Sequence, residues 1–173
     1  MAELPNLRDD AFWDAPAPEP LITGRDGGKI RKRRAYKERL ETRGRARALQ
    51  ALYAADMRDF SQLKRIAAQV FDDLSIVPEE RLFASALIAT IAEHGVALDK
   101  ALTEVTENWR FERLGAIERS VLRVAAAEFQ QNDAPVKVVL QEAVRLAERF
   151  GTERSARFVN GVLDAYARRL GKL

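Results

Sequence analysis

The chain has 173 residues, of which 47% are hydrophobic and 32% are charged, which suits one domain with a sizeable core. It contains no cysteine and one histidine, which excludes a disulfide framework, a thiolate metal site and a histidine-based metal site. No apolar run approaches the roughly 20 residues of a membrane-spanning helix, and the start has no signal-peptide pattern. We therefore expect a soluble, cytoplasmic protein with no membrane contact.

The net charge of +3 conceals three unlike segments. Residues 1–24 carry one basic and five acidic side chains, and four prolines, with no apolar periodicity. Residues 25–47 carry eleven basic and three acidic side chains, whereas residues 48–173 carry 17 and 18. We predict that residues 1–40 form a disordered extension, acidic and then basic, because they cannot bury enough apolar surface to offset chain entropy. Residues 41–173 form the predicted folded domain.

From about Thr42 onward, apolar residues recur with the period of amphipathic helices, and no stretch alternates as a strand would. The inward-facing stripes of seven predicted helices run through Leu49–Met57, Leu63–Leu74, Leu82–Ile91, Leu98–Val105, Ile117–Phe129, Val139–Phe150 and Phe158–Leu170. The predicted fold class is therefore all-α, a compact seven-helix bundle.

Helix-capping and helix-breaking residues mark several ends of these helices. Pro78 and the two acids after it suit the first turn of a helix. Asp133–Pro135 is a candidate cap for the sixth helix, and Gly151 should end it. Thr152 or a neighbour is expected to cap the last helix.

The sequence offers no candidate catalytic, cofactor or metal site. The Glu-x-x-His motif of helical dicarboxylate metal centres is absent, and Glu93 and His94 are adjacent rather than spaced for one face. We interpret His94 as an ordinary surface or helix-terminal histidine. Neither glycine-rich phosphate-binding motif occurs, and no nucleophile has a base at a recognisable spacing.

The basic segment predicts a polyanionic partner, because clustered arginine and lysine neutralise phosphates and release counterions. For Lys29–Arg39, a solvated tail and an RNA contact are equally good interpretations. Arg43, Arg45 and Arg47 abut the first folded helix, and we predict that they bind RNA. Because a spacing of two would put them on different faces of a helix, we expect a partly extended arm.

A second candidate RNA surface opens the last predicted helix, at Arg154, Arg157 and Phe158. Free backbone N–H groups and the helix dipole favour an anion at such a position. Phe158 also fits the apolar stripe, so core packing competes with base stacking as its role. Arginine beside an aromatic ring is nevertheless a combination that binds single-stranded RNA.

Four linked segments resemble the NusB family of transcription antitermination factors, in order, over about residues 42–170. They are Arg45-Ala-Arg-Ala-Leu-Gln-Ala-Leu-Tyr53, then Trp109 with Arg113-Leu114 and Ile117–Glu128, then Val138–Ala147, and finally Phe150-Gly151 with Phe158–Asp164. The resemblance implies a seven-helix NusB fold without enzyme activity or cofactor. It also implies binding to the boxA element of nascent, single-stranded RNA, together with NusE, a protein shared with the small ribosomal subunit. Such a protein would act in the antitermination complex on transcribing RNA polymerase and support transcription of rRNA operons.

The resemblance also assigns roles to residues. The RNA-binding set implied is Arg43, Arg45, Arg47, Gln50, Arg154, Arg157 and Phe158. The partner-binding set implied is Tyr53 and Glu118, which without the resemblance would as readily be a core tyrosine and a helix-surface acid. Arg154 stands where some relatives carry an acid, a difference that would either strengthen RNA binding or change its sequence preference. Residues 1–40 precede the point where most relatives begin. Some relatives are dimeric, so a homodimer is left open.

Two other classes of function compete with this interpretation. Some rRNA methyltransferases carry a NusB-like RNA-recognition domain at their amino end. No cofactor-binding half follows Leu173, so this alternative requires that the sequence be a fragment. A helical regulator that binds duplex DNA through its final helix is the third class.

Overall fold

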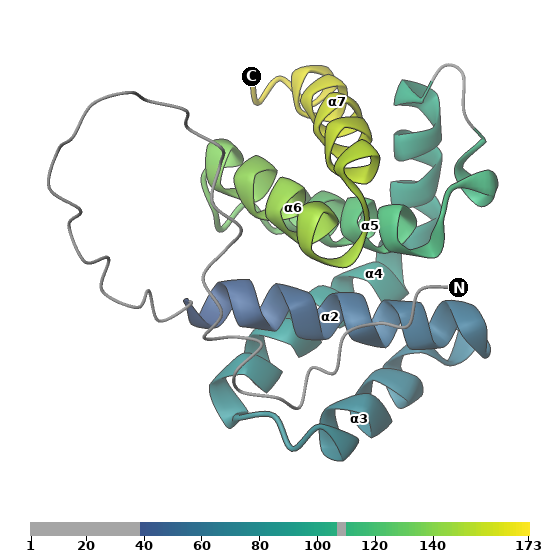
Figure 1. The fold of residues 1–173 in the computed structure, drawn as a ribbon, viewed down its shortest axis with the longest axis vertical. Helices are drawn as coiled ribbons and strands as arrows, with labels where there is room; N and C mark the ends of the chain where they lie inside the picture. The colour runs from purple at the N-terminus through teal and green to yellow at the C-terminus, as the bar shows by residue number, and fades with distance from the viewer. Residues whose placement is uncertain (1–38, 107–109) are drawn as a thin grey trace, which may run out of the picture. The chain divides into compact units, whose positions relative to one another are not determined.

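The computed structural model describes residues 39–106 and 110–173. Within these residues the chain forms six α-helices and two short 3-10 helices, and no strand (Figure 1). They are α2 (Leu40–Met57), η1 (Phe60–Gln62), α3 (Leu63–Asp73), α4 (Pro78–Val105), η2 (Phe111–Arg113), α5 (Ala116–Gln131), α6 (Val136–Phe150) and α7 (Glu153–Arg169). The predicted all-α class is confirmed. The predicted disordered extension lies outside the described residues as far as residue 38, and Trp109 lies outside them too.

The prediction of seven helices is wrong for the described residues, because the third and fourth expected helices form one. α4 continues without a break from Pro78 to Val105. Its inward residues Leu87, Ile91, Leu98 and Leu102 follow one another at helical spacing and are all buried. Gly95 lies between the two stripes, but a single glycine costs a helix only about 1 kcal/mol and does not end it.

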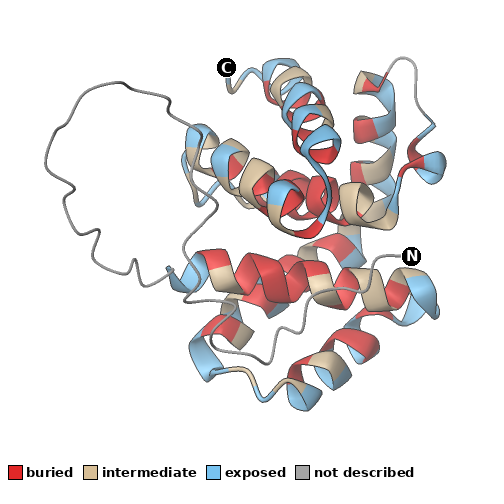
Figure 2. Cartoon of the chain, viewed as in Figure 1, coloured by how far each residue is buried: buried red, intermediate tan, exposed pale blue. Residues whose placement is uncertain are grey.

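Neighbouring helices cover α2 on several sides. It packs against α3, α4 and α5, and its residues from Gly44 to Leu49 are buried without interruption (Figure 2). Small side chains allow this close packing: a Cβ atom added to Gly44 would lie 2.6 Å from Cδ1 of Phe83 on α4. A helix that neighbours cover on several sides buries whatever side chains it carries, polar ones included.

The predicted helix ends are partly confirmed. Pro78 is the first residue of α4, and Gly151 caps the end of α6. Thr152 caps α7: its Oγ1 accepts a hydrogen bond from the Ser155 N–H at 3.2 Å, and Ser155 Oγ accepts one from the Thr152 N–H at 3.0 Å. The predicted side-chain cap at Asp133–Pro135 is wrong, because Pro135 itself is the capping residue and no side chain bonds to the first turn of α6.

One described helix, α4, is long and apolar enough to cross a membrane by length and composition alone, with a mean hydropathy of 1.4 over its most apolar window. The core helix of a soluble protein passes the same test. α4 packs against α2, α3, α5 and α7, and its Glu80 is a buried, ion-paired carboxylate. α4 thus packs against four other helices, and 28% of its most apolar window is buried.

Candidate nucleic-acid interface

The arginines predicted to form an extended arm are helical. Arg43, Arg45 and Arg47 all lie in the first turns of α2. Arg43 and Arg47 are four residues apart and share one face of α2, whereas Arg45 lies on another. Each of these two faces meets a carboxylate of a neighbouring helix. The prediction of a partly extended arm is therefore wrong, because tertiary packing covers the faces that the sequence left open.

Arg45 is enclosed by two acids and an aromatic ring. Its Nε donates to Glu128 Oε2 at 2.8 Å and its Nη2 donates to Glu128 Oε1 at 2.6 Å. Glu142 lies 3.5 Å away on the opposite side of the guanidinium, which also stacks over the ring of Phe83 with its Cζ 5.3 Å from the centroid. Because Arg45 and Glu128 are only 4% and 5% exposed, this two-pronged pair is shielded from water.

Glu80 at the start of α4 gathers the other two arginines of α2. Its Oε1 lies 2.9 Å from Arg43 Nε, and its Oε2 accepts a hydrogen bond from Arg47 Nε at 3.4 Å. Glu80 and Arg47 are buried, whereas the side chain of Arg43 keeps a quarter of its surface exposed. Arg43 is therefore the most exposed member of the trio, although its Nε pairs with the buried carboxylate of Glu80.

RNA binding by Arg45 and Arg47 stays a prediction, and their geometry disfavours direct contact. A phosphate would have to replace a carboxylate inside the bundle, which would leave that carboxylate buried without its countercharge. Gln50, one turn further along α2, is half-buried. Its Oε1 is enclosed without a hydrogen-bond partner among the described residues.

A second cluster of charges holds the end of α2 against the start of α5. Asp56 accepts hydrogen bonds from Arg119 Nη2 at 3.0 Å and Arg123 Nη1 at 3.2 Å, and Arg123 also pairs with Asp99 of α4. Burial alone would lower the pKa of Arg123, but the hydrogen bonds and charges of Asp99 and Asp56 outweigh it and leave that pKa raised. The guanidinium also stacks on Phe60, with its Cζ 4.3 Å from the ring centroid.

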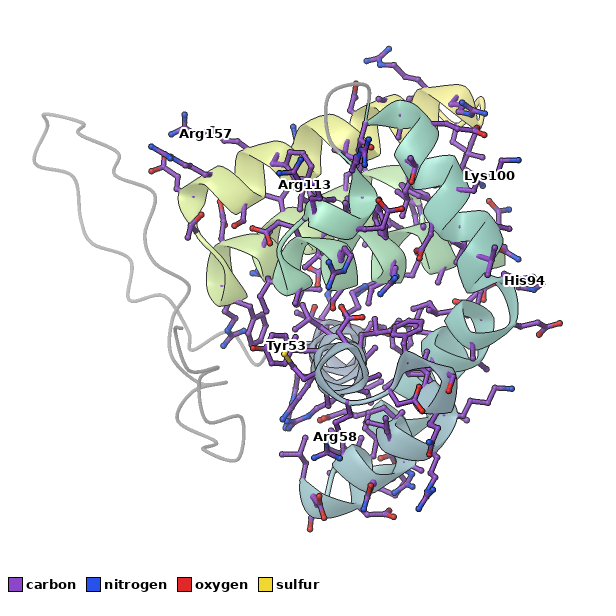
Figure 3. The ribbon with its side chains drawn as sticks, turned by 90° about the vertical axis from the view of Figure 1, so that its right-hand side faces the viewer. Tyr53, Arg58, His94, Lys100, Arg113 and Arg157 are labelled. Atoms are coloured by element: carbon purple, nitrogen blue, oxygen red, sulfur yellow. The ribbon has the colours of Figure 1, made fainter. Side chains whose placement is uncertain are left out.

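The start of α7 presents its cations to solvent. Arg154 is exposed, and the side chain of Arg157 is 75% exposed, with its Nη2 2.5 Å from Glu153 Oε1. Arg157 projects away from the ribbon (Figure 3). Phe158 is half-buried and makes contacts within the fold, and its stacking on a base stays a prediction. Here the predicted surface does bring exposed arginines and an aromatic ring together within one turn of helix.

The two residues of the predicted partner-binding set lie on packed neighbours, Tyr53 on α2 and Glu118 on α5. Both are half-buried. Glu118 Oε1 accepts a hydrogen bond from Ser155 Oγ, at the start of α7, at 2.5 Å. The predicted partner acid is thus bonded directly to the turn that carries the predicted RNA contacts.

Three carboxylates that hold the arginines of α2 were not predicted from the sequence, namely Glu80, Glu128 and Glu142. A signal was available for Glu128, which lies in the apolar run Val124-Ala-Ala-Ala-Glu-Phe129 with no polar neighbour. An acid placed among residues of a buried stripe needs a buried countercharge. Ser155 gave no signal beyond its place in a capping motif.

The described residues contain no group of three or more His, Cys, Asp or Glu side chains that could hold a metal ion. The side chain of His94 is 42% exposed on α4, with Nε2 3.8 Å from Glu93 Oε1. Its interpretation as a surface histidine is confirmed.

Comparison with known proteins gives a consistent set of relatives. The model of the NusB family matches residues 42–168. The transcription antitermination protein NusB of Anaeromyxobacter dehalogenans is 42% identical over 135 residues, which are 73% of this chain and 89% of the relative. Its counterpart in Sorangium cellulosum is 40% identical and covers 75% of this chain and 93% of its own.

Solved structures share the fold as well. The Thermotoga protein described as "T. maritima NusB" has a TM-score of 0.69 and 32% identity, covering 74% of this chain and 90% of its own. A chain from a crystal structure of the antitermination factors NusB and NusE in complex with dsRNA has a TM-score of 0.68 and 26% identity, covering 75% and 97%. The family match, the relatives and the helical bundle agree: the chain belongs to the NusB family, whose members are transcription antitermination factors and not enzymes.

Proposed function

We propose that this protein binds single-stranded boxA RNA together with NusE, in the antitermination complex on transcribing RNA polymerase, and supports transcription of rRNA operons. The observation that carries the proposal is the exposed cationic turn at the start of α7, within a chain of the NusB family. A related NusB has been crystallised with NusE and dsRNA, which supports NusE and an RNA as the two kinds of partner. Such a protein works in the cytoplasm, where RNA polymerase transcribes.

The RNA surface proposed consists of the α7 surface, defined as Arg154, Arg157 and Phe158, with Arg43 and Gln50 of α2 as further contacts. In the α7 surface the free N–H groups and dipole of the helix add to two exposed guanidiniums. Phe158 offers an aromatic edge for stacking. Arg45 and Arg47 act indirectly in this proposal, because their buried pairs hold α2 in place beneath Arg43.

The partner surface proposed for NusE is Tyr53 and Glu118. A half-buried tyrosine gives apolar contact with a hydroxyl at its tip, and tyrosine is enriched at protein interfaces for that reason. The ion cluster around Asp56 fixes the helix ends that carry these two side chains. Tyr53→Ala and Glu118→Arg should therefore weaken NusE binding while the helical content is retained.

The decisive experiment compares a boxA RNA with a scrambled RNA of equal length and composition, each titrated against the full chain. We expect tighter binding to boxA, and equal affinities would contradict the proposal. Duplex DNA of the same sequence serves as a third ligand, and a preference for it would favour the duplex-DNA regulator instead. Titration with NusE, followed by sedimentation, separates a complex with NusE from a homodimer.

In this proposal the basic run Lys29–Arg39 adds electrostatic attraction for RNA of any sequence and makes no contact with particular bases. Deletion of residues 1–39 should lower the affinity for both RNAs by a similar factor and flatten the dependence on salt, because fewer counterions are released. The preference for boxA should survive the deletion. A loss of preference would move the selective contacts into the extension.

A further inference from the structure

One hydrogen bond joins the start of α5 to the start of α7. Ser155 Oγ donates to Glu118 Oε1 at 2.5 Å, across 37 positions of sequence. Ser155 is only 4% exposed, so water does not readily compete for this bond. The bond connects the acid of the partner surface with the turn that carries the α7 surface.

Ser155 is also the centre of that turn. Its backbone N–H bonds to Thr152 Oγ1, and its Oγ accepts from the Thr152 N–H. Arg154 directly precedes Ser155 in the sequence, and Arg157 follows it by two positions. A shift of Ser155 therefore changes where both guanidiniums point.

Two glycines leave room for this arrangement. A Cβ atom added to Gly115 would lie 2.2 Å from Glu118 Oε2, and one added to Gly151 would lie 2.8 Å from Ser155 Oγ. Neither glycine has a positive φ that would itself require glycine. Gly115 thus leaves space for the Glu118 carboxylate. Gly151 leaves space for the Ser155 hydroxyl and for the backbone oxygen of Ala147, which would also lie 2.8 Å from the added Cβ atom.

We propose that Ser155 is a positioning residue that couples the two surfaces through Glu118. A partner bound at Glu118 holds the carboxylate on Ser155, and the start of α7 is thereby held in the conformation that binds RNA. This inference rests on the proposed function. Since coupling between two sites is reciprocal, RNA must raise the affinity for NusE by the same factor as NusE raises the affinity for RNA.

The test measures the dissociation constant of the full chain for boxA RNA, without NusE and with saturating NusE. For the natural sequence we expect NusE to tighten RNA binding by about fivefold or more, at the lower end of usual coupling factors. Ser155→Ala should bring this factor to within about twofold of unity, because the α7 turn no longer senses Glu118. NusE should still bind to Ser155→Ala without RNA, because Tyr53 and the Glu118 carboxylate are both retained.

Two further variants separate coupling from helix capping. Thr152→Ala removes one cap bond of the same turn but leaves the Ser155–Glu118 bond, so it should weaken RNA binding equally with and without NusE and keep the factor. Gly115→Ala breaks the same Ser155–Glu118 bond from the Glu118 side. Its methyl group displaces the Glu118 carboxylate, and no residue of α7 is changed. It should abolish the factor as Ser155→Ala does.

Each outcome is informative. The inference is overturned if NusE tightens RNA binding by Ser155→Ala as much as it does for the natural chain. It is also overturned if Thr152→Ala loses this tightening to the same degree as Ser155→Ala. If Ser155→Ala does not fold, Gly115→Ala decides by the same criterion. A natural chain that binds RNA and NusE independently overturns the coupling but leaves the proposed function standing, whereas a chain that binds neither overturns the proposed function and the inference together.

Discussion

Arg45 in α2 and Arg157 in α7 are the same kind of side chain in opposite surroundings. Arg45 is 4% exposed and held by a two-pronged bond to Glu128 and by a second acid. The side chain of Arg157 is 75% exposed and pairs with one exposed acid on its own helix. The first arginine cannot leave its partners cheaply, whereas the second loses little when it exchanges Glu153 for a phosphate. Burial, rather than residue type, divides the arginines that hold the fold from those that are able to bind.

The largest expected effect is on stability at the buried pair. Glu128→Ala should lower the free energy of unfolding by about 3 to 5 kcal/mol, because it leaves the charge of Arg45 buried without its main partner. Urea denaturation followed by circular dichroism measures the change. Glu153→Ala is the matched control, since it removes the acid beside exposed Arg157, and it should cost less than about 0.5 kcal/mol. A similar decrease in the free energy of unfolding in both variants would contradict the difference proposed between the buried pair of Arg45 and the exposed pair of Arg157.

A smaller effect is expected on RNA binding at the exposed pair. Arg154→Gln and Arg157→Gln should each reduce the slope of log affinity against log salt by about 0.7, the value for one phosphate contact on a single strand. Stability should stay within about 0.5 kcal/mol of the natural chain. Arg168→Gln removes an equally exposed charge at the other end of the same helix. An equal change of slope in that control would mean that total charge, and not the start of α7, sets the affinity.

The smallest effect lies on the inward face of α7, where the contrast between buried and exposed side chains recurs within one helix. Burial raises the pKa of Tyr166 above its ordinary value of 10.0, and the charge of Arg169 opposes this shift. A group whose pKa is higher in the folded state stabilises the fold below its unfolded pKa, and that contribution is lost as the pH rises through the folded pKa. The free energy of unfolding should therefore fall above about pH 10, more steeply in the natural chain than in Tyr166→Phe. If the free energy of unfolding falls equally in the two chains, the pKa of Tyr166 is not raised in the folded state.

Much of the candidate RNA surface was accessible to reasoning from sequence. Arg154, Arg157 and Phe158 lie near the start of a helix marked by Gly151 and Thr152, and a helix start is a local feature with known free N–H groups. The exposure of the two arginines agrees with the apolar stripe, which occupies other positions of the helix. The half-buried state of Phe158 reflects its place at the edge of that stripe.

The arginines of α2 show where such reasoning stops. Arg43, Arg45 and Arg47 belong to a strongly basic segment, and nothing within that segment distinguishes a solvated arm from a buried helix. Their carboxylate partners come from α4, α5 and α6, between 33 and 97 positions away. An ion pair between distant residues depends on helix packing that local propensity does not encode.

The sequence by itself determined the helical class, some of the helix ends and the family, because periodicity, capping residues and linked motifs are local and survive in any arrangement of the helices. Only the tertiary structure decided that α4 is a single helix, that α2 is covered on several sides, and that Ser155 bonds to Glu118. Each of these depends on which faces meet and how much water remains between them. For the basic segment at the start of the domain, that difference decides which charges support the fold and which remain available to an RNA.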